Sequence, residues 1–518
     1  MPEKTARRLR LVIAIAGGAA LGLATPPIDF YPAAWIGQAA LAWALFEQHR
    51  DEAVSASTFR RWLTGALTGW LFGTAANVVV LRFVPTTIVR FTPLPLPVGL
   101  LALLLLGMAE GLRWLVVGAA TRQLVLRRVP GFLAFGVAVW LSTFVPVVFP
   151  WSVAGGISPA TRLMQLADVI GERGTSALFA MSAALLAEAV RSQLSKEQRL
   201  AMQHAAFGLG IPLLMGVFGH VRMAQVESAR MAAPHARIAL VQPSTQARER
   251  WDPNEATSIL RRLTMLTTAA EQRGADLVIW PEAAFPYTLP ATATNDLAGS
   301  WAVLQPGVRG PVLTGVLMQG RGAAYNSAAT VHGGRIDPPY HKMHLLAFGE
   351  SVPLADTFPA LKKAFVRGTG LAAGTNQVLQ QSGPIRAAVL NCFEDILPDA
   401  GREAADVDPN VLVNVTNDAW FAGTQESELH LRLAAMRAIE LRRDFVRAVN
   451  LGPTSWIDAA GVVRGRYDLP IAGSLAAQPA LLDGRTIYAR FGDWAGALVL
   501  GLLSAAVWLG TKRKRRAD

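Results

Sequence analysis

Cysteine and charged residues are both scarce in this sequence. Its 518 residues include one cysteine, Cys392, which excludes an internal disulfide framework and any multi-cysteine metal cluster. Only 17% of the residues are charged and 52% are hydrophobic. The chain is therefore neither disordered nor an ordinary cytosolic enzyme, because too much apolar surface would need covering. If the thiol of Cys392 has a role, that role is chemical.

The excess positive charge is confined to the hydrophobic parts of the chain. The formal net charge is +12, yet residues 231–490 carry 24 basic and 24 acidic residues. The excess lies outside this stretch, in clusters at residues 4–10, 60–61, 122–128, 191–199 and 512–516. Each cluster adjoins an apolar run, which is how cytoplasmic loops of membrane proteins are marked. We therefore expect a lipid bilayer as a partner and no nucleic-acid binding.

Eight apolar runs are candidate membrane spans. They cover residues 11–26, 31–47, 62–84, 95–119, 130–150, 175–190, 204–221 and 492–510. The first run could instead be a cleaved signal peptide, but the second follows almost at once, which favours a span. The positive-inside rule then places both termini in the cytoplasm and residues 222–491 on the outer side, which in a bacterial inner membrane is the periplasm.

Glu110, Arg113 and Glu188 are among the ionisable residues that lie within these runs. Such groups are costly in hydrocarbon and often mark transport paths. Glu110 and Arg113 are three residues apart, so we expect them on one helix face, close enough to neutralise each other. Glu188 lies near the end of a run. A structural pair and a terminal glutamate are favoured over a proton relay.

From Arg237 onward the pattern changes to short β-rich runs separated by helical ones. We expect strands at residues 236–241, 276–280, 312–317, 324–332, 385–390, 411–415 and 445–449, and helices near 253–273 and 427–443. This alternation predicts a sheet-based α/β domain. Residues 355–376 form a long stretch without a pattern, so we expect a lid, a binding arm or disorder there.

The chain therefore divides into four parts. Residues 1–222 are expected to form a membrane domain with seven transmembrane helices, and residues 231–490 a folded domain on the periplasmic side. Residues 492–510 are expected to form the C-terminal transmembrane helix, and residues 511–518 a basic cytoplasmic tail.

Three segments with reactive side chains follow or adjoin the expected strands, where α/β sheets place functional groups. They are Trp280-Pro281-Glu282, then the run from Tyr340 to Leu345 with Phe348-Gly349-Glu350, and Asn391-Cys392-Phe393-Glu394. Taken singly, Glu282 is typical of a cap or an ion-pair partner, Lys342 of a surface charge and Cys392 of an inert buried thiol. His341 and His344 lack a third ligand, so no metal is expected.

The wording and order of these segments resemble the nitrilase, or carbon–nitrogen hydrolase, superfamily, whose members use a Glu-Lys-Cys triad. The closer resemblance is to its membrane members, the apolipoprotein N-acyltransferase family. It runs through LVIWPEAAFP, YNSAAT, YHKMHLLAFGESVPL, AVLNCFEDI, VNVTNDAWF and MRAIELRRDFVRAVNLG. Eight spans with the catalytic domain between the seventh and the eighth also look like that family. The resemblance implies a multi-span α-helical bundle joined to an αββα sandwich.

Carried over residue by residue, the resemblance assigns four catalytic residues: Glu282 as general base, Lys342 as oxyanion-stabilising lysine, Cys392 as nucleophile and Glu350 as second glutamate. It also places substrate contacts at Phe393, Glu394, Trp420 and Phe348. Two departures are visible. Phe393 stands where Tyr is common, and the fifth span reads WLSTFVPVVFPW where relatives commonly carry Glu and Arg before the PW pair.

The resemblance implies a two-stage acyl transfer that needs no cofactor. A free thiol has a pKa of about 8.5 and is mostly protonated at neutral pH. It therefore requires a base or a nearby cation before it attacks an ester. Cys392 would take a fatty-acyl chain from a membrane phospholipid. The acceptor would be the N-terminal amine of S-diacylglyceryl-cysteine in an apolipoprotein. A membrane-tethered amidase that passes the acyl group to water and a binding or transport protein without catalysis are the alternatives.

Overall fold

The computed structural model describes residues 3–51, 57–347, 349–352, 357 and 370–517. The chain forms two compact units. The first comprises Met1–Val221 and Phe491–Asp518 and is called the membrane unit after its expected location. The second comprises Arg222–Arg490 and is called the catalytic unit after its expected role.

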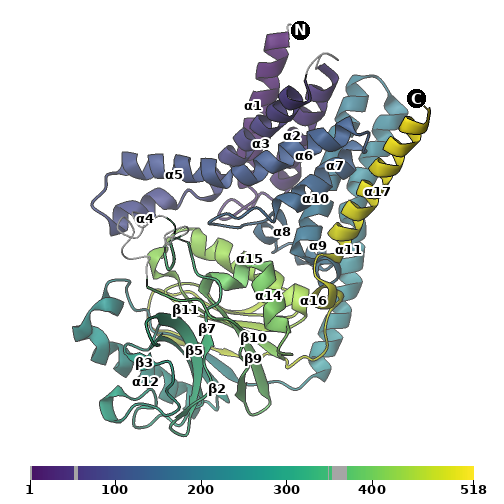
Figure 1. The fold of residues 1–518 in the computed structure, drawn as a ribbon. Helices are drawn as coiled ribbons and strands as arrows, with labels where there is room; N and C mark the ends of the chain where they lie inside the picture. The colour runs from purple at the N-terminus through teal and green to yellow at the C-terminus, as the bar shows by residue number, and fades with distance from the viewer. Residues whose placement is uncertain (1–2, 52–56, 348, 353–356, 358–369, 518) are drawn as a thin grey trace. The chain divides into compact units, whose positions relative to one another are not determined.

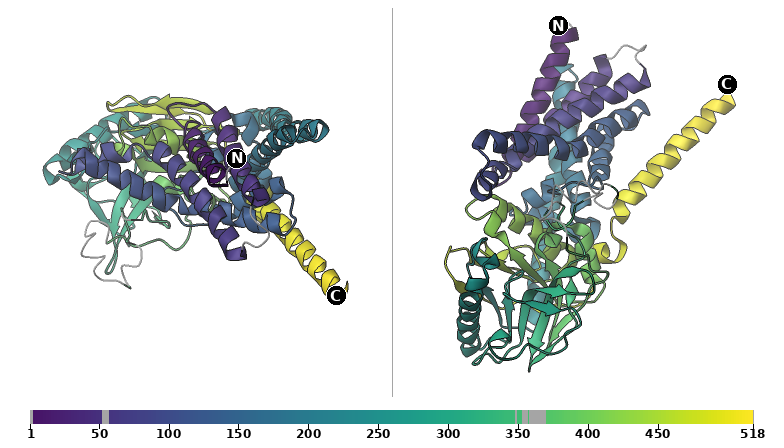
Figure 2. Two further views of the ribbon diagram at one scale, coloured as in Figure 1. Left: turned by 90° about the horizontal axis from the view of Figure 1, so that it is seen from above. Right: turned by 60° about the vertical axis from the view of Figure 1, so that its left-hand side comes forward.

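The membrane unit is entirely helical in its regular structure (Figure 1). Its helices are α1 (Glu3–Gly22), α2 (Pro32–Asp51), α3 (Thr58–Val80), α4 (Val84–Phe91), α5 (Leu96–Glu110), α6 (Leu112–Leu126), α7 (Gly131–Ser142), α8 (Val153–Gly156), α9 (Thr161–Met164), α10 (Ala167–Leu194), most of α11 (Gln198–Ala232) and α17 (Trp494–Ala517). In both Figure 1 and Figure 2 the start of α1 and the end of α17 lie at the same end of the unit.

Glycine lets the helices of this unit approach closely. A Cβ added at Gly118 of α6 would lie 2.0 Å from the carbonyl oxygen of Gly65 in α3, and one added at Gly69 would lie 2.1 Å from the carbonyl oxygen of Trp114. An apolar side chain in a membrane is buried equally well against lipid and against another helix. Association of membrane helices therefore depends on close packing, which small residues at the crossings allow. The α3–α6 contact therefore depends on these glycines.

Four helical stretches of the described chain are long and apolar enough to cross a membrane: Phe59–Val80, Leu96–Leu126, Ala167–Leu194 and Gln198–Ala232. Gly131–Ser142 and Trp494–Ala506 are shorter apolar helices. Each of the eight expected runs contains a helix, but the fifth is helical only as far as Ser142. The expected count of eight spans thus stays a prediction.

Glu110 and Arg113 do not pair as expected. They lie on different helices, because α5 ends at Glu110 and α6 begins after Gly111. Glu110 Oε1 accepts a hydrogen bond of 2.8 Å from the backbone N–H of Val148, and Arg113 donates one of 2.8 Å to the carbonyl of Trp151. Both side chains therefore bind the irregular backbone that follows α7.

The catalytic unit is built on two mixed β-sheets (Figure 1). The first has the order β14-β1-β2-β4-β5-β6, with β3 beside β4 and β7 beside β5. Its strands are β1 (Ile238–Gln242), β2 (Leu277–Trp280), β3 (Thr288–Pro290), β4 (Val312–Gln319), β5 (Ala324–His332), β6 (Arg335–Ile336), β7 (Tyr340–His341) and β14 (Gly473–Ala477). Strands β1, β2 and β4 are parallel neighbours.

The second sheet has the order β13-β12-β11-β10-β9-β8. Its strands are β8 (Gln380–Ser382), β9 (Ile385–Asn391), β10 (Val411–Asn417), β11 (Phe445–Asn450), β12 (Thr454–Ile457) and β13 (Val463–Tyr467). Strands β9, β10 and β11 are parallel, so their carboxyl ends meet at one edge of the sheet. Cys392 and Asp418 follow β9 and β10 at that edge.

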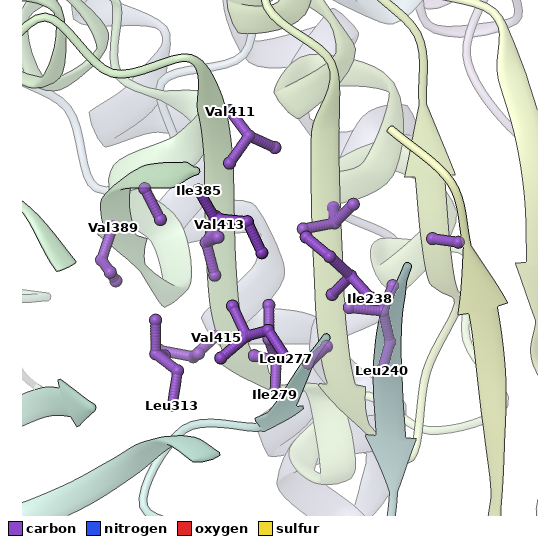
Figure 3. Close-up of a cluster of buried hydrophobic side chains, with 14 of the residues drawn as sticks. Ile238, Leu240, Leu277, Ile279, Leu313, Ile385, Val389, Val411, Val413 and Val415 are labelled. Carbon is purple, nitrogen blue, oxygen red and sulfur yellow. The ribbon is translucent and has the colours of Figure 1, made fainter. Parts of the chain in front are cut away.

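The main core lies between the two sheets (Figure 3). Ile238, Leu277 and Leu313 of the first sheet belong to one cluster with Val389 and Val413 of the second, and each is 2% exposed or less. Burying such a side chain stabilises the fold by about 1.5–3 kcal/mol. Because helices cover the other faces as well, these strands are apolar on both sides and read as continuous hydrophobic runs.

Helices cover the outer face of each sheet. The helix α12 (Ala256–Gln272) packs Leu263 against the outer face of the first sheet, and α15 (Glu426–Leu441) packs Leu431 against that of the second, together with α14 (Pro398–Ala405). The unit is therefore an αββα sandwich. Most of residues 355–376 lie outside the described residues, so the expected lid is not tested.

Candidate active site

Glu282 lies directly after β2, in a turn whose backbone is tightly constrained. Its side chain is 11% exposed. A Cβ added at Gly315 of β4 would lie 2.3 Å from the carbonyl oxygen of Pro281, so only glycine lets the neighbouring strand pass this turn. Arg250 donates to the carbonyls of Ala283 and Phe285 and so holds the chain just beyond. The carboxylate is thus presented from a rigid position.

Lys342 follows the short strand β7 and is 1% exposed. Its backbone N–H donates to the carbonyl of Asn326, and its own carbonyl accepts from Gly374, both at 2.8 Å. The ammonium Nζ lies 2.7 Å from Glu350 Oε2 and 3.6 Å from Glu282 Oε1. A buried cation is tolerated only when it is paired in this way.

Cys392 is the first residue after β9 and begins the 3-10 helix η5 (Cys392–Ile396), here called the nucleophile turn. Its backbone φ is +55°, a left-handed conformation that is strained for a residue with a Cβ. Asn414 of β10 donates to its carbonyl at 2.9 Å and helps to hold that conformation. Strain of this kind clusters at functional sites. The side chain is half-buried, so a substrate can reach it.

Glu394 fastens the nucleophile turn to the loop that carries Lys342. Its Oε2 accepts hydrogen bonds of 2.7 Å from the hydroxyl of Tyr340 and the backbone N–H of Asn391. Its Oε1 accepts from the backbone N–H groups of Met343 at 2.7 Å and His344 at 2.9 Å. The side chain is fully buried and both of its oxygens are engaged within the protein, and the expected substrate contact at Glu394 stays a prediction.

Asn326 of β5 lies at the centre of the acidic groups. Its Nδ2 donates to Glu282 Oε1 at 2.7 Å and to Glu350 Oε1 at 2.9 Å. Its Oδ1 accepts from Asn391 Nδ2 at 3.1 Å, which connects it to the residue before the nucleophile. One neutral amide therefore holds two carboxylates near one lysine, so that their mutual repulsion does not drive them apart.

The electrostatics of the site keep the proton on the thiol until the reaction begins. Burial raises the pKa of Cys392 well above its usual value; the charge of Glu282 adds to this, and that of Lys342 opposes it. Burial likewise raises the pKa of Glu282, and the thiol of Cys392 hydrogen-bonds this carboxylate. Burial disfavours the charged Lys342, but the charge of Glu282 and then that of Cys392 raise its pKa overall.

Glu350 differs from Glu282 although both face Lys342. Burial disfavours its charged form, but the ammonium of Lys342 and the backbone N–H of Leu346 hold the pKa of Glu350 below its usual value. Glu350 is therefore the permanent anion of the pair. Glu282, with the raised pKa, is the carboxylate that can exchange a proton with Cys392.

The remaining residues that we expected to contact substrate differ in their exposure. The ring of Phe393 lies 5.6 Å from Lys342 Nζ and is half-buried, so it borders the catalytic cation. Trp420 ends the 3-10 helix η6 (Asp418–Trp420) and is 41% exposed. Phe348 lies outside the described residues.

One group of described side chains has the composition of a metal site. Asp418, Glu426 and His430 each offer a ligand atom, and these atoms lie within 4.8 Å of one another. However, His430 Nε2 lies 2.7 Å from Asp395 Oδ1. Burial disfavours the charged imidazole, but Asp395 raises the pKa of His430 to about 10. A metal ion would have to displace that proton, so the arrangement favours an imidazolium over a metal ligand.

Comparisons with known proteins show the family to which the chain belongs. Residues 17–185 match the apolipoprotein N-acyltransferase N-terminal domain, and residues 237–468 match the carbon-nitrogen hydrolase domain. The apolipoprotein N-acyltransferase of Bradyrhizobium diazoefficiens is 30% identical over 98% of this chain and 95% of its own. That of Brucella melitensis is 31% identical over 98% of this chain and 97% of its own. The chain belongs to the apolipoprotein N-acyltransferase family.

Structural likeness is weaker than sequence likeness. An amidase of the nitrilase superfamily from Nesterenkonia is 17% identical, with a TM-score of 0.37 over 50% of this chain and 94% of that one. This likeness is too low to say anything about the site. Membership of the apolipoprotein N-acyltransferase family rests on the full-length relatives.

For this member of the apolipoprotein N-acyltransferase family, the structure brings together four of the expected residues: Glu282, Lys342, Glu350 and Cys392. Sequence analysis missed Asn326 as a site residue. The signal was present, because Asn326 stands in the motif YNSAAT, within an expected strand that ends before the lysine segment. An amide side chain that is buried in a strand requires a partner, and here its partners include the two glutamates.

Proposed function

We propose that this family member transfers a fatty-acyl chain from a membrane phospholipid, through a thioester on Cys392, to the N-terminal amine of an S-diacylglyceryl-cysteine in an apolipoprotein. The observation that supports the proposal most is the grouping of one thiol, one ammonium and two carboxylates from distant segments of the chain. An acid, a cation and a thiol in contact are the parts that acyl transfer through a thioester needs.

In the first stage the sulfur of Cys392 attacks the ester carbonyl of the phospholipid. The S–C bond forms, Glu282 accepts the thiol proton, and the carbonyl oxygen becomes an anion beside Lys342. When the tetrahedral intermediate collapses, the C–O bond breaks. Glu282 then gives the proton to the departing alkoxide, which leaves as lysophospholipid. The charge of Glu350, 2.7 Å from Lys342 Nζ, helps to keep Lys342 protonated while Glu282 carries the proton.

In the second stage the free amine of the acceptor attacks the thioester. The N–C bond forms and the S–C bond breaks, while Glu282 takes a proton from the amine and returns it to the sulfur of Cys392. The product is an amide, and the enzyme is restored. Because one product leaves before the second substrate reacts, this scheme requires ping-pong kinetics.

Two half-buried or exposed rings, one beside the catalytic lysine and one in the segment after β10, are suited to contact the acyl chain or the lipid headgroup. Phe393 lies beside the cation and Trp420 has 41% of its surface exposed. We assign them as substrate contacts by position. Large aromatic surfaces left exposed next to reactive groups are typical of binding sites for apolar ligands.

We further propose a multi-pass inner-membrane protein with about eight spans, the catalytic unit on the periplasmic side and both termini in the cytoplasm. The basic clusters at residues 4–10 and 512–516 support this orientation. So does the arrangement of the membrane unit, in which α1 begins and α17 ends on the same side. Both substrates are held in the bilayer by their lipid chains, so an enzyme in the same membrane can meet them without either substrate leaving the bilayer.

The experiment that tests the function is mass spectrometry of the full-length protein incubated with phospholipid. A fatty-acyl mass on Cys392 that is discharged by a diacylglyceryl-cysteine peptide supports the transferase. Discharge by water alone would show the amidase-type hydrolase instead. No adduct in the wild-type protein, or an adduct that survives in Cys392→Ala, would overturn the thioester mechanism.

A further inference from the structure

Behind the nucleophile turn lies a buried group of ionisable side chains that the proposed reaction does not use. Three are acidic and two are basic: Asp395, Asp418, Glu426, His430 and Arg447. Asp395 and Arg447 are completely buried, Asp418 is 1% exposed and His430 is 6% exposed. Burying so many charges costs free energy unless each is paired, so their arrangement requires an explanation.

His430 lies between two aspartates that come from different segments. On one side its Nε2 lies 2.7 Å from Asp395 Oδ1, and on the other its Nδ1 lies 3.4 Å from Asp418 Oδ1. Because both ring nitrogens face carboxylates, both act as donors only when the ring carries two protons. The imidazolium form therefore joins the two aspartates.

The two aspartates belong to the two segments that surround the thiol. Asp395 is part of the nucleophile turn, three residues after Cys392, and Arg447 of β11 donates to its Oδ2 at 3.0 Å. Asp418 begins η6, which ends at Trp420. Two residues before Asp418 is Thr416, whose hydroxyl interacts with the thiol of Cys392 and lowers its pKa.

We propose that His430 is a positioning residue for the acyl transfer, which holds the nucleophile turn through Asp395 and the Thr416–Trp420 segment through Asp418. Glu394 fastens the front of the turn to the lysine loop, and His430 fastens its back to α15 and the end of β10. The strained backbone of Cys392 is thereby held from two sides. The inference rests on the proposed role of Cys392 as nucleophile.

The charges around His430 support a permanent imidazolium. Facing it are Asp395, Asp418 and Glu426, with Arg447 as the one other cation of the group. Burial opposes the charged ring, but the aspartates raise its pKa to about 10. Burial and the charge of Asp418 raise the pKa of Glu426 to about 8. With Glu426 protonated, two negative and two positive charges remain, and the group is neutral.

The test compares His430→Gln with His430→Asn. A Gln amide reaches the position of Nε2 and keeps a donor for Asp395, whereas an Asn amide replaces Nδ1 and keeps a donor for Asp418. Because each variant loses one link and the charge, we expect the rate of acyl loading on Cys392 to fall about 10- to 100-fold, as misplacement by about 1 Å does in other enzymes. Loading is followed by mass spectrometry under single-turnover conditions, below the melting temperature of every variant.

A second substitution separates positioning from general damage. Removing the imidazolium leaves Asp395 and Asp418 against Arg447 when Glu426 is protonated, so His430→Gln combined with Asp418→Asn restores neutrality around Asp395. We expect the double variant to load Cys392 at least about threefold faster than His430→Gln alone, which is a coupling of the size seen between neighbours in one network. The matched control is His332→Gln, which makes the same exchange at an exposed histidine–aspartate contact of 3.0 Å in the same unit and should load at the wild-type rate.

Hydrogen exchange tests the bridge itself, independently of acyl transfer. In His430→Ala the amides of residues 393–396 and 418–421 should lose protection together, because one side chain restrains both segments. Exchange that increases in one segment only, or loading within twofold of wild type in both His430→Gln and His430→Asn, would overturn the proposal. If wild-type protein takes up no acyl group, the proposed function fails, and the exchange result still decides whether His430 is the bridge.

Discussion

The ammonium of Lys342 is paired with Glu350, at 2.7 Å, more closely than with Glu282, at 3.6 Å. This difference separates the roles of two otherwise similar carboxylates. Glu350 neutralises the buried lysine and stays ionised, which leaves Glu282 available as the base for Cys392. A single glutamate could not do both, because a carboxylate that takes up a proton would leave the lysine unpaired in a buried site.

Glu350→Gln tests this division of roles. The variant leaves Lys342 with Glu282 as its main partner, so Glu282 is less able to accept the thiol proton. We expect acyl loading of Cys392 to fall about 10- to 100-fold, the size of effect that a lost acid–base contribution produces. Single-turnover loading followed by mass spectrometry measures it. Glu255→Gln, which changes a partner of Ser258 away from the site, is the control and should load normally. Normal loading in Glu350→Gln would contradict the proposed roles.

Lys342→Met tests the oxyanion role. The methionine keeps the volume of the buried chain but removes the donor, which typically costs about 3–4 kcal/mol of transition-state stabilisation. We expect no detectable acyl-enzyme on the time scale of wild-type loading, with the fold retained in circular dichroism. Full activity in this variant would remove the lysine from the mechanism.

Asn326→Ala tests how the pKa of Glu282, the proposed general base, is set. The amide of Asn326 lowers the pKa of Glu282, against burial, which raises it. Losing the amide raises that pKa further, so Glu282 stays protonated to a higher pH. The base must be deprotonated to act, and the loading rate therefore begins to rise at a higher pH than in wild type. The measurement is the pH–rate profile of loading, and an acid limb that moves to lower pH would count against the assignment.

His430 should make the stability of the catalytic unit depend on alkaline pH. The pKa of His430 is raised to about 10 in the fold, above the usual value of 6.5. A raised pKa contributes stability that is complete below about 6.5 and is lost as the pH rises through about 10. Hydrogen exchange of α15, corrected for intrinsic rates, should therefore show falling stability between these values. His430→Gln should flatten that dependence, and an equally steep one in the variant would refute the charge assignment.

Periodicity and composition predicted much of the fold. The seven expected strands of the α/β domain correspond to β1, β2, β4, β5, β9, β10 and β11, because a strand buried on both faces is a continuous apolar run. Short or polar strands such as β8 and β13 contain no apolar run and were therefore not predicted. The fifth expected span was too long, because apolar letters continue beyond Ser142 while the backbone leaves the helix.

At the candidate site, too, some features were predicted from the sequence and others were not. Glu282, Lys342, Glu350 and Cys392 were predicted through their motifs, each next to an expected strand. For Glu394 the expected substrate contact stays a prediction, because adjacency to the nucleophile in sequence does not tell which way a side chain points. Its carboxylate instead points into the protein, where Tyr340 and three backbone N–H groups hold it.

The sequence by itself determined the class of protein, the positions of the reactive residues and the chemistry of which a thiol, an acid and an amine are capable. These follow from residue types and their spacing, which are local properties. Only the tertiary structure decided which carboxylate pairs with Lys342, that Asn326 joins the two glutamates, and that His430 joins Asp395 to Asp418. Apart from the Lys342–Glu350 pair, those contacts join residues more than ten positions apart in the sequence, and their strength depends on burial and distance, which no pattern along the chain records.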